Sequence, residues 1–273
     1  MIEINGPMAS TNFQKQRKVV SLMAALAWSA MALIAASPSK AADDSVFKTK
    51  DVILVHGAWA DGSSWSKVIP LLERKGFHVT AVQLPLTSVA DDVATLRRAI
   101  EFDPGPLLLV GHSYAGVVIS EAGNDPKVSG LVYISAYAPD SGQSVVSLNA
   151  LVPETPVTLE FSLNEGFLSL SNEGIRADFA PDLPDREQHN LAVTQGPIAE
   201  VAFGTPATAP AWRAKPSWYM VASEDRVISP RLEAMMAQTI NAETVTVHSS
   251  HVIMLSRPEA VADFIARAAN GRD

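Results

Sequence analysis

The sequence predicts an α/β fold with a mostly parallel, doubly wound sheet, and two patterns support this prediction. Short apolar runs alternate with segments of helical periodicity along the chain after residue 51. The first run, Asp51–Val55, is apolar without polar alternation, which is typical of a strand covered on both faces. The chain has 273 residues, of which 47% are hydrophobic and 18% charged, so it can bury the core that such a sheet requires.

The elements follow one another in an order that favours parallel strands joined by helical crossovers. Strands are expected at residues 51–55, 78–84, 106–110, 128–135, 218–222 and 243–247. Helices are expected at residues 64–75, 91–101, 114–123, 230–238 and 258–269. Gly76 ends the first helix, and Pro230 begins the fourth. Proline is common at this first position because an N–H group there makes no hydrogen bond within the helix.

One stretch, at about residues 141–213, does not fit this alternation. Together with Pro139 just before it, the stretch holds eight of the 18 prolines, and its apolar residues, such as Phe161 and Phe179, are scattered. A structureless connection of this length is uncommon between two core strands. We therefore expect an inserted cap at about 141–213 within a single domain of residues 42–273.

The first 41 residues have the order of features found in a secretory signal peptide. Four residues, Lys15–Lys18, form a basic stretch, an uncharged apolar run covers 19–36, and the small residues Ser39 and Ala41 fit a cleavage site. The apolar run has 18 residues, close to the lower limit for spanning a bilayer, so an uncleaved anchor is the alternative. Pro38 and the cleavage site favour removal. We expect residues 1–41 to be a signal peptide and the protein to be periplasmic or secreted.

Charge and cysteine content exclude several classes of function. There are 21 Lys+Arg and 29 Asp+Glu, for a net charge of −8. Residues 1–41 carry +3, so the chain after cleavage carries −11. This balance argues against nucleic acid as a partner and against stable membrane association after cleavage. The absence of cysteine excludes disulfides, thiolate metal sites and a cysteine nucleophile.

A candidate nucleophile follows the strand that ends at residue 110. The sequence Gly-His-Ser-Tyr-Ala-Gly covers residues 111–116. A serine on a tight strand-to-helix turn is pushed out over the sheet, and Ser113 has this position. The backbone N–H of Tyr114, at the start of the next helix, would then face a developing oxyanion. Ala115 takes the last position of the pattern G-x-S-x-G, so its methyl group needs room beside the strand.

A candidate base, His251, lies after the last short strand. A neutral imidazole can accept the proton of Ser113 and later return it to a leaving group. His248 is the nearby competitor, but it continues an alternating strand pattern, which indicates a strand or surface residue.

A candidate acid follows the strand at 218–222. Asp225 would orient the imidazole and stabilise its charged form. Glu224 is the reserve, and Asp140 is a more distant alternative. The order Ser113, Asp225, His251 is the nucleophile–acid–base order expected of this architecture.

The turn after the first strand supplies a fourth feature. Its sequence is His-Gly-Ala-Trp at residues 56–59, and the N–H of Ala58 would complete an oxyanion hole with that of Tyr114. Each such donor contributes on the order of 3 kcal/mol to transition-state stabilisation. His56 and His112 have no second ligand at a metal-binding spacing, so we expect no metal site.

These four features together resemble the α/β-hydrolase superfamily over roughly residues 51–269. The resemblance implies an α/β-hydrolase fold with an inserted cap, a serine nucleophile, and neither a metal nor an organic cofactor. It is closest to small esterases, a group that resembles plant methyl-ester hydrolases, hydroxynitrile lyases and bacterial carboxylesterases.

We therefore expect a serine hydrolase that cleaves a carboxylic ester of a small or medium hydrophobic substrate through an acyl-enzyme. A hydroxynitrile lyase on the same triad is one alternative. It would place a lysine over the triad, whereas Lys215, near the acid and base motifs, precedes its strand. A non-catalytic ligand-binding protein is the other alternative, and it would be supported by a degenerate triad. Nothing in the sequence predicts an oligomeric state.

The signal-peptide assignment predicts the N-terminus of the exported protein. Mass spectrometry of the secreted or periplasmic form is expected to find it near Ala42, because the small residues before this position suit signal peptidase. A chain that retains Met1 would contradict cleavage.

Overall fold

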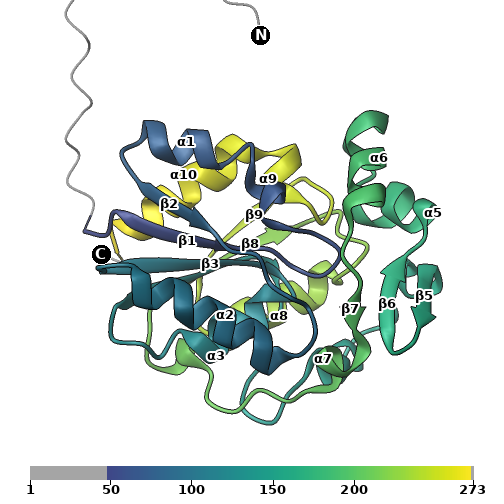
Figure 1. Ribbon diagram of the computed structural model, residues 1–273, viewed down its shortest axis with the longest axis horizontal. Coiled ribbons are helices and arrows are strands. Elements are labelled where there is room, and N and C mark those ends of the chain that lie inside the picture. The colour runs from purple at the N-terminus through teal and green to yellow at the C-terminus, as the bar shows by residue number, and fades with distance from the viewer. Residues whose placement is uncertain (1–47, 272–273) are drawn as a thin grey trace, which may run out of the picture. The chain divides into compact units, whose positions relative to one another are not determined.

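The computed structural model describes residues 48–271 and contains a six-stranded parallel sheet (Figure 1). Its strand order is β2-β1-β3-β4-β8-β9. The strands are β1 (Asp51–Val55), β2 (His78–Ala81), β3 (Leu107–Ser113), β4 (Val128–Ala136), β8 (Ser217–Ala222) and β9 (Glu243–Val247). Each neighbouring pair is parallel, which confirms the predicted fold class. The predicted signal peptide lies outside the described residues.

The burial of the strands explains their sequence patterns. All seven residues of β3, at the centre of the sheet, are buried, so no polar alternation is needed there. The edge strand β9 alternates between exposed and half-buried residues. β3 also runs three residues beyond its predicted end, because Gly111–Ser113 continue the pairing with β4 although they carry no apolar signal.

Helices cover both faces of the sheet (Figure 1). α1 (Ile69–Arg74), α9 (Ile253–Ser256) and α10 (Pro258–Ala269) lie on one face, and α2 (Val89–Phe102), α3 (Ala115–Ala122) and α8 (Pro230–Thr239) lie on the other. The helix predicted at 64–75 is instead a 3₁₀ turn followed by α1. Pro70 explains the late start of α1, since proline fits only the first turn of a helix. None of the helices within residues 48–271 is long and apolar enough to cross a membrane.

The segment between β4 and β8 lies beyond the carboxyl ends of the sheet strands (Figure 1), and we call residues 141–213 the cap segment. It contains a small antiparallel sheet and several short helices. The strands are β5 (Phe161–Asn164), β6 (Phe167–Leu170) and β7 (Ile198–Ala199), and the helices are α4 (Val145–Asn149), α5 (Asn172–Gly174), α6 (Asp185–Thr194) and α7 (Glu200–Gly204). Single 3₁₀ or π turns lie at Gly62–Trp65, Pro156–Glu160, Ile175–Phe179 and Ala211–Arg213.

One close approach ties α3 to the end of β4. A Cβ atom at Gly116 would lie 2.0 Å from the carbonyl oxygen of Tyr137, which belongs to the backbone and cannot move aside easily. Only glycine therefore allows the first turn of α3 to pack at this distance.

We expect Gly116→Ala to destabilise the protein by about 1–3 kcal/mol, as overpacking in a filled core does. Gly204→Ala is the matched control, because a Cβ atom there has no neighbour within 4 Å. Urea unfolding measures both variants. Equal stability of the Gly116 variant and the wild type would contradict the close approach.

Candidate active site

Ser113 lies on a strained turn at the carboxyl end of β3. Its φ is +56°, in the left-handed region that non-glycine residues rarely adopt. Such strain costs on the order of 1–3 kcal/mol and persists only where the surroundings fix it. Gly57 contributes to this fixation, since a Cβ atom there would lie 2.7 Å from Ser113 Cβ and 2.9 Å from the His112 carbonyl oxygen. The turn is therefore held by packing that a side chain at Gly57 would prevent.

Ala115 fits although the pattern G-x-S-x-G has glycine at its position. Its side chain is fully buried. The strand residue that faces its backbone is Gly111, where a Cβ atom would lie 2.9 Å from the Ala115 carbonyl oxygen. The positions at which the backbone is too close for a side chain are therefore Gly111 and Gly116, and the methyl group of Ala115 is accommodated.

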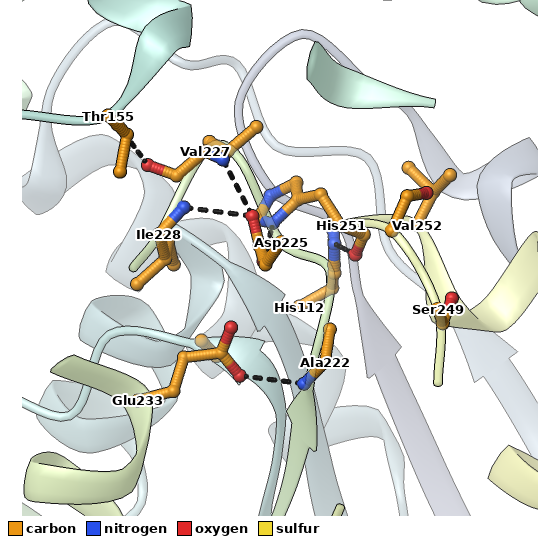
Figure 2. A network of polar contacts seen from close by, with 12 residues as sticks. His112, Thr155, Ala222, Asp225, Val227, Ile228, Glu233, Ser249, His251 and Val252 are labelled. Carbon is orange, nitrogen blue, oxygen red and sulfur yellow. Dashed lines mark hydrogen bonds and ion pairs between the residues drawn. The ribbon is translucent and has the colours of Figure 1, made fainter. Parts of the chain in front are cut away.

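Asp225 and His251 form a hydrogen-bonded pair with both side chains fully buried (Figure 2). His251 Nδ1 donates to Asp225 Oδ2 at 2.6 Å. Asp225 Oδ1 accepts from the backbone N–H groups of Val227 at 2.7 Å and Ile228 at 2.9 Å. With the proton on Nδ1, His251 Nε2 carries a lone pair, and this atom has no hydrogen-bond partner within residues 48–271. The imidazole is thus oriented and ready to accept a proton.

The other candidate acids and the competing histidine lie elsewhere. The Glu224 side chain is 61% exposed and is 3.5 Å from Nδ1 of His248, which is itself 80% exposed. Asp140 accepts a hydrogen bond from Nε of Arg213 at 2.8 Å, away from the imidazole. Of the acids considered from the sequence, Asp225 is the one that contacts His251.

His112, next to Ser113 in the chain, contacts the loop of His251 (Figure 2). Its Nε2 donates to the His251 carbonyl oxygen at 3.0 Å, and the centroids of the two rings are 4.6 Å apart. Burial and the neighbouring His251 hold the pKa of His112 well below its usual 6.5, so His112 is neutral. Because His112 directly precedes Ser113, this contact links the loop of the candidate base to the turn of the candidate nucleophile.

The cap segment contacts both loops that carry the pair. Asp178 accepts from Nε of Arg226 at 2.7 Å, next to Asp225 in the chain. Asp182 accepts from the backbone N–H of Ser250 at 3.0 Å, next to His251. Between them, the Phe179 ring lies 5.2 Å from the His251 ring. No local sequence pattern predicts these three contacts, since the partners lie far apart along the chain.

Ala58 and Tyr114 line the same cavity as Ser113, as an oxyanion hole requires. The Tyr114 hydroxyl donates to Asp92 Oδ2 at 2.7 Å. Asp92 also accepts from the backbone N–H of Leu86 at 2.8 Å. Burial raises the pKa of Asp92, although these hydrogen bonds oppose the rise. A buried carboxyl group on α2 therefore anchors the side chain of Tyr114.

The cavity has a volume of about 260 Å³, and its walls are mostly aromatic and aliphatic. The cap segment supplies most of the lining. Trp59 is one of the lining residues, and its ring centroid lies 5.3 Å from that of Phe161 and 5.8 Å from that of Phe203. The Trp59 indole donates to the Leu168 carbonyl oxygen at 3.0 Å, which fixes the ring against the cap.

His56 has a structural role in the turn before Ala58. Its Nε2 accepts from the backbone N–H of Leu84 at 2.9 Å, so the proton lies on Nδ1, which contacts the Gly57 carbonyl oxygen at 2.9 Å. Burial lowers its pKa, and the ring is neutral. Within the described residues, no group of three or more His, Asp or Glu side chains is placed to hold a metal ion.

Ser113 on a strained turn and the buried Asp225–His251 pair both lie at the carboxyl ends of parallel strands, an arrangement found in α/β hydrolases. The sequence profile of the Alpha/beta hydrolase family matches residues 52–264, and the chain belongs to this family. Its relatives include esterases and hydrolases.

Three of these relatives differ in the activity that their names state. Methylesterase 2 of Arabidopsis thaliana is 25% identical, over 80% of this chain and 95% of its own. An alpha-hydroxynitrile lyase of the same plant is 26% identical, over 80% of this chain and 96% of its own. A pyrethroid hydrolase from Sphingobium faniae has a crystal structure that matches with a TM-score of 0.71 and 25% identity, covering 81% of this chain and 98% of that one.

The contact of Asp182 predicts how strongly the loop of His251 is held. Asp182→Ala is expected to speed hydrogen exchange at the Ser250 amide by tenfold or more, since that N–H loses its acceptor. Asp185→Ala, an exposed change three residues on, is the control.

The protection by Asp182 also depends on pH. Hydrogen bonds from Ser250 lower the pKa of Asp182 despite its partial burial. Its contribution is therefore present above the ordinary value of 3.8 and is lost as the pH falls through the lowered pKa. Exchange at Ser250 that is equally fast in the wild type and the Asp182 variant would show that the contact is absent in solution.

Proposed function

We propose that this hydrolase is a serine esterase that cleaves a carboxylic ester through an acyl-enzyme. Ser113 is the nucleophile, His251 the base, and Asp225 the group that orients His251. The observation that carries the proposal is the buried Asp225–His251 hydrogen bond, which leaves His251 Nε2 without a partner among residues 48–271, on a loop that His112 ties to the strand of Ser113. The methylesterase among the relatives also supports it.

The reaction proceeds in two halves. Ser113 Oγ attacks the ester carbonyl carbon while its proton passes to His251 Nε2, and the oxyanion accepts hydrogen bonds from the N–H groups of Ala58 and Tyr114. The tetrahedral intermediate collapses when His251 gives the proton to the departing alcohol. A water molecule, deprotonated by His251, then attacks the acyl-enzyme, and its collapse returns the proton to Ser113 and releases the acid. Asp225 stays ionised throughout, held by its two backbone donors.

The cavity supports a neutral hydrophobic substrate of small or medium size. Among the described residues that line it, Glu200 is the one with a charged side chain, and a carboxylate disfavours anionic substrates. An adjoining cavity of about 420 Å³ shares Val146, Asn149, Thr155 and Thr158 with the first. The two cavities offer separate room for the acyl and alcohol parts of an ester.

The second candidate is a hydroxynitrile lyase on the same triad, which the Arabidopsis relative favours. We expect a lyase to place a lysine over the triad. None of the described residues that line the 260 Å³ cavity is a lysine. Lys215 donates instead to the backbone carbonyl oxygens of Asp125 at 3.2 Å and Val128 at 2.7 Å, at the start of the neighbouring strand. These contacts support the esterase over the lyase.

A series of p-nitrophenyl esters of increasing acyl length tests the proposal. Ser113→Ala is expected to lower kcat/KM by a factor of about 10⁴ or more, and Asp225→Asn by about 10³–10⁴. Glu224→Gln is the matched control and is expected to stay within threefold of the wild type, because its carboxylate is exposed. Equal rates for Ser113→Ala and the wild type would remove the nucleophile assignment. Faster cleavage of a cyanohydrin than of any ester would favour the lyase.

A further inference from the structure

A second carboxyl group, that of Glu233, is buried next to the acid of the proposed triad. Glu233 lies in the first turn of α8 and is inaccessible to solvent. Its Oε2 accepts from the backbone N–H of Ala222, the last residue of β8, at 3.1 Å (Figure 2). No hydrogen-bond donor within residues 48–271 reaches its Oε1, and its nearest acidic neighbour is the Asp225 carboxylate. The proposed mechanism uses neither oxygen.

None of the described residues around Glu233 supplies a positive charge to it. The ionisable groups that face it are Asp225 from the loop after β8, Tyr219 from β8 and Tyr137 from the segment after β4. The Tyr219 hydroxyl donates to the Ala136 carbonyl oxygen, and the Tyr137 hydroxyl donates to Asn149 Oδ1 at 3.1 Å. Neither hydroxyl group therefore donates its proton to Glu233. None of the ion pairs within the described part of the chain includes Glu233.

Two ionised carboxylates cannot share such a site, so one of them holds a proton. Asp225 accepts three hydrogen bonds, from His251, Val227 and Ile228, and these stabilise its charged form. Glu233 accepts one, and its unpartnered oxygen is explained if it carries the proton. Burial and the neighbouring Asp225 carboxylate raise the pKa of Glu233 well above its ordinary value of 4.5, in agreement with this assignment.

We propose that Glu233 is a neutral carboxylic acid at the working pH and a positioning residue, which turns the proton on Oε1 toward the Asp225 carboxylate. The catalytic part of this inference rests on the proposed function, whereas the protonation does not. A neutral donor beneath Asp225 stabilises its negative charge without cancelling it. The bond from Ala222 to Oε2 fixes the strand end from which the loop of Asp225 departs. Glu233 thereby holds the acid in place for His251.

The sign of the pH dependence follows from the raised pKa. Below pH 4.5 the folded and unfolded chains both hold the proton of Glu233. Above it the unfolded chain releases the proton and the folded chain keeps it, so wild-type stability is lost as the pH rises toward the folded pKa. Glutamine has the shape of the protonated acid and cannot ionise. Its advantage over glutamate therefore grows with pH.

The first experiment measures chemical unfolding of the wild type and Glu233→Gln between pH 5 and pH 8. The ratio of their unfolding constants, wild type over variant, is expected to rise with pH by up to tenfold per unit. Glu101→Gln makes the same chemical change at an exposed site, and its ratio is expected to stay flat. A flat ratio for Glu233→Gln would overturn the neutral acid. This readout needs no enzymatic activity, so it is independent of the esterase proposal.

The second experiment measures kcat, KM and the pH profile of ester hydrolysis. Glu233→Gln is expected to keep kcat within threefold of the wild type, because its amide still donates to Asp225. Glu233→Leu cannot donate, and we expect kcat to fall tenfold or more, with little change in KM and with the acid limb of kcat/KM moved to higher pH. Equal kcat for the two variants, or an equal loss in both, would overturn the positioning role. If the leucine variant does not fold, the glutamine variant decides alone. A tenfold loss of kcat in Glu233→Gln would then overturn the positioning role, and a kcat within threefold of the wild type would support it.

Discussion

The site depends on a hydrogen bond between a carboxylate and an imidazole that are both removed from water. A buried charge is tolerated only where it is paired and hydrogen-bonded, and this condition shapes the surrounding chain. The loop after β8 turns so that the N–H groups of Val227 and Ile228 face Asp225. The loop after β9 is held to β3 by His112. These contacts bring together the ends of β3, β8 and β9.

Much of the sheet could be predicted because its signals are local. The bounds of β9 and α10 agree with the sequence pattern to the residue, since edge alternation and an amphipathic stripe with proline at its start are complete within each segment. The end of β3 could not be predicted from apolar character, as Gly111 and His112 extend a strand through pairing with β4. The late start of α1 follows from Pro70, whose effect the apolar stripe of the same stretch concealed.

The residues of the site also fall into those that a local sequence pattern predicts and those that it does not. The sequence patterns around Ser113, Asp225 and His251 predict catalytic roles, and the structure brings the three segments together. The residues that support them carry no such pattern. Asp92 and Glu233 both lie in the first turn of a helix, where acidic side chains are common and usually solvated. Only the tertiary fold shows that Asp92 anchors Tyr114 and that Glu233 is enclosed beside Asp225.

The contacts of Asp178, Phe179 and Asp182 have a consequence for protein engineering. Exchange of the cap for that of another hydrolase is an obvious way to change which molecules fit the cavity. In this chain a five-residue stretch of the cap segment, residues 178–182, contacts both the loop of Asp225 and the loop of His251. A grafted cap would deprive the two loops of their outer supports, so a chimera needs equivalent residues at these three positions before its selectivity can be compared with that of its parent.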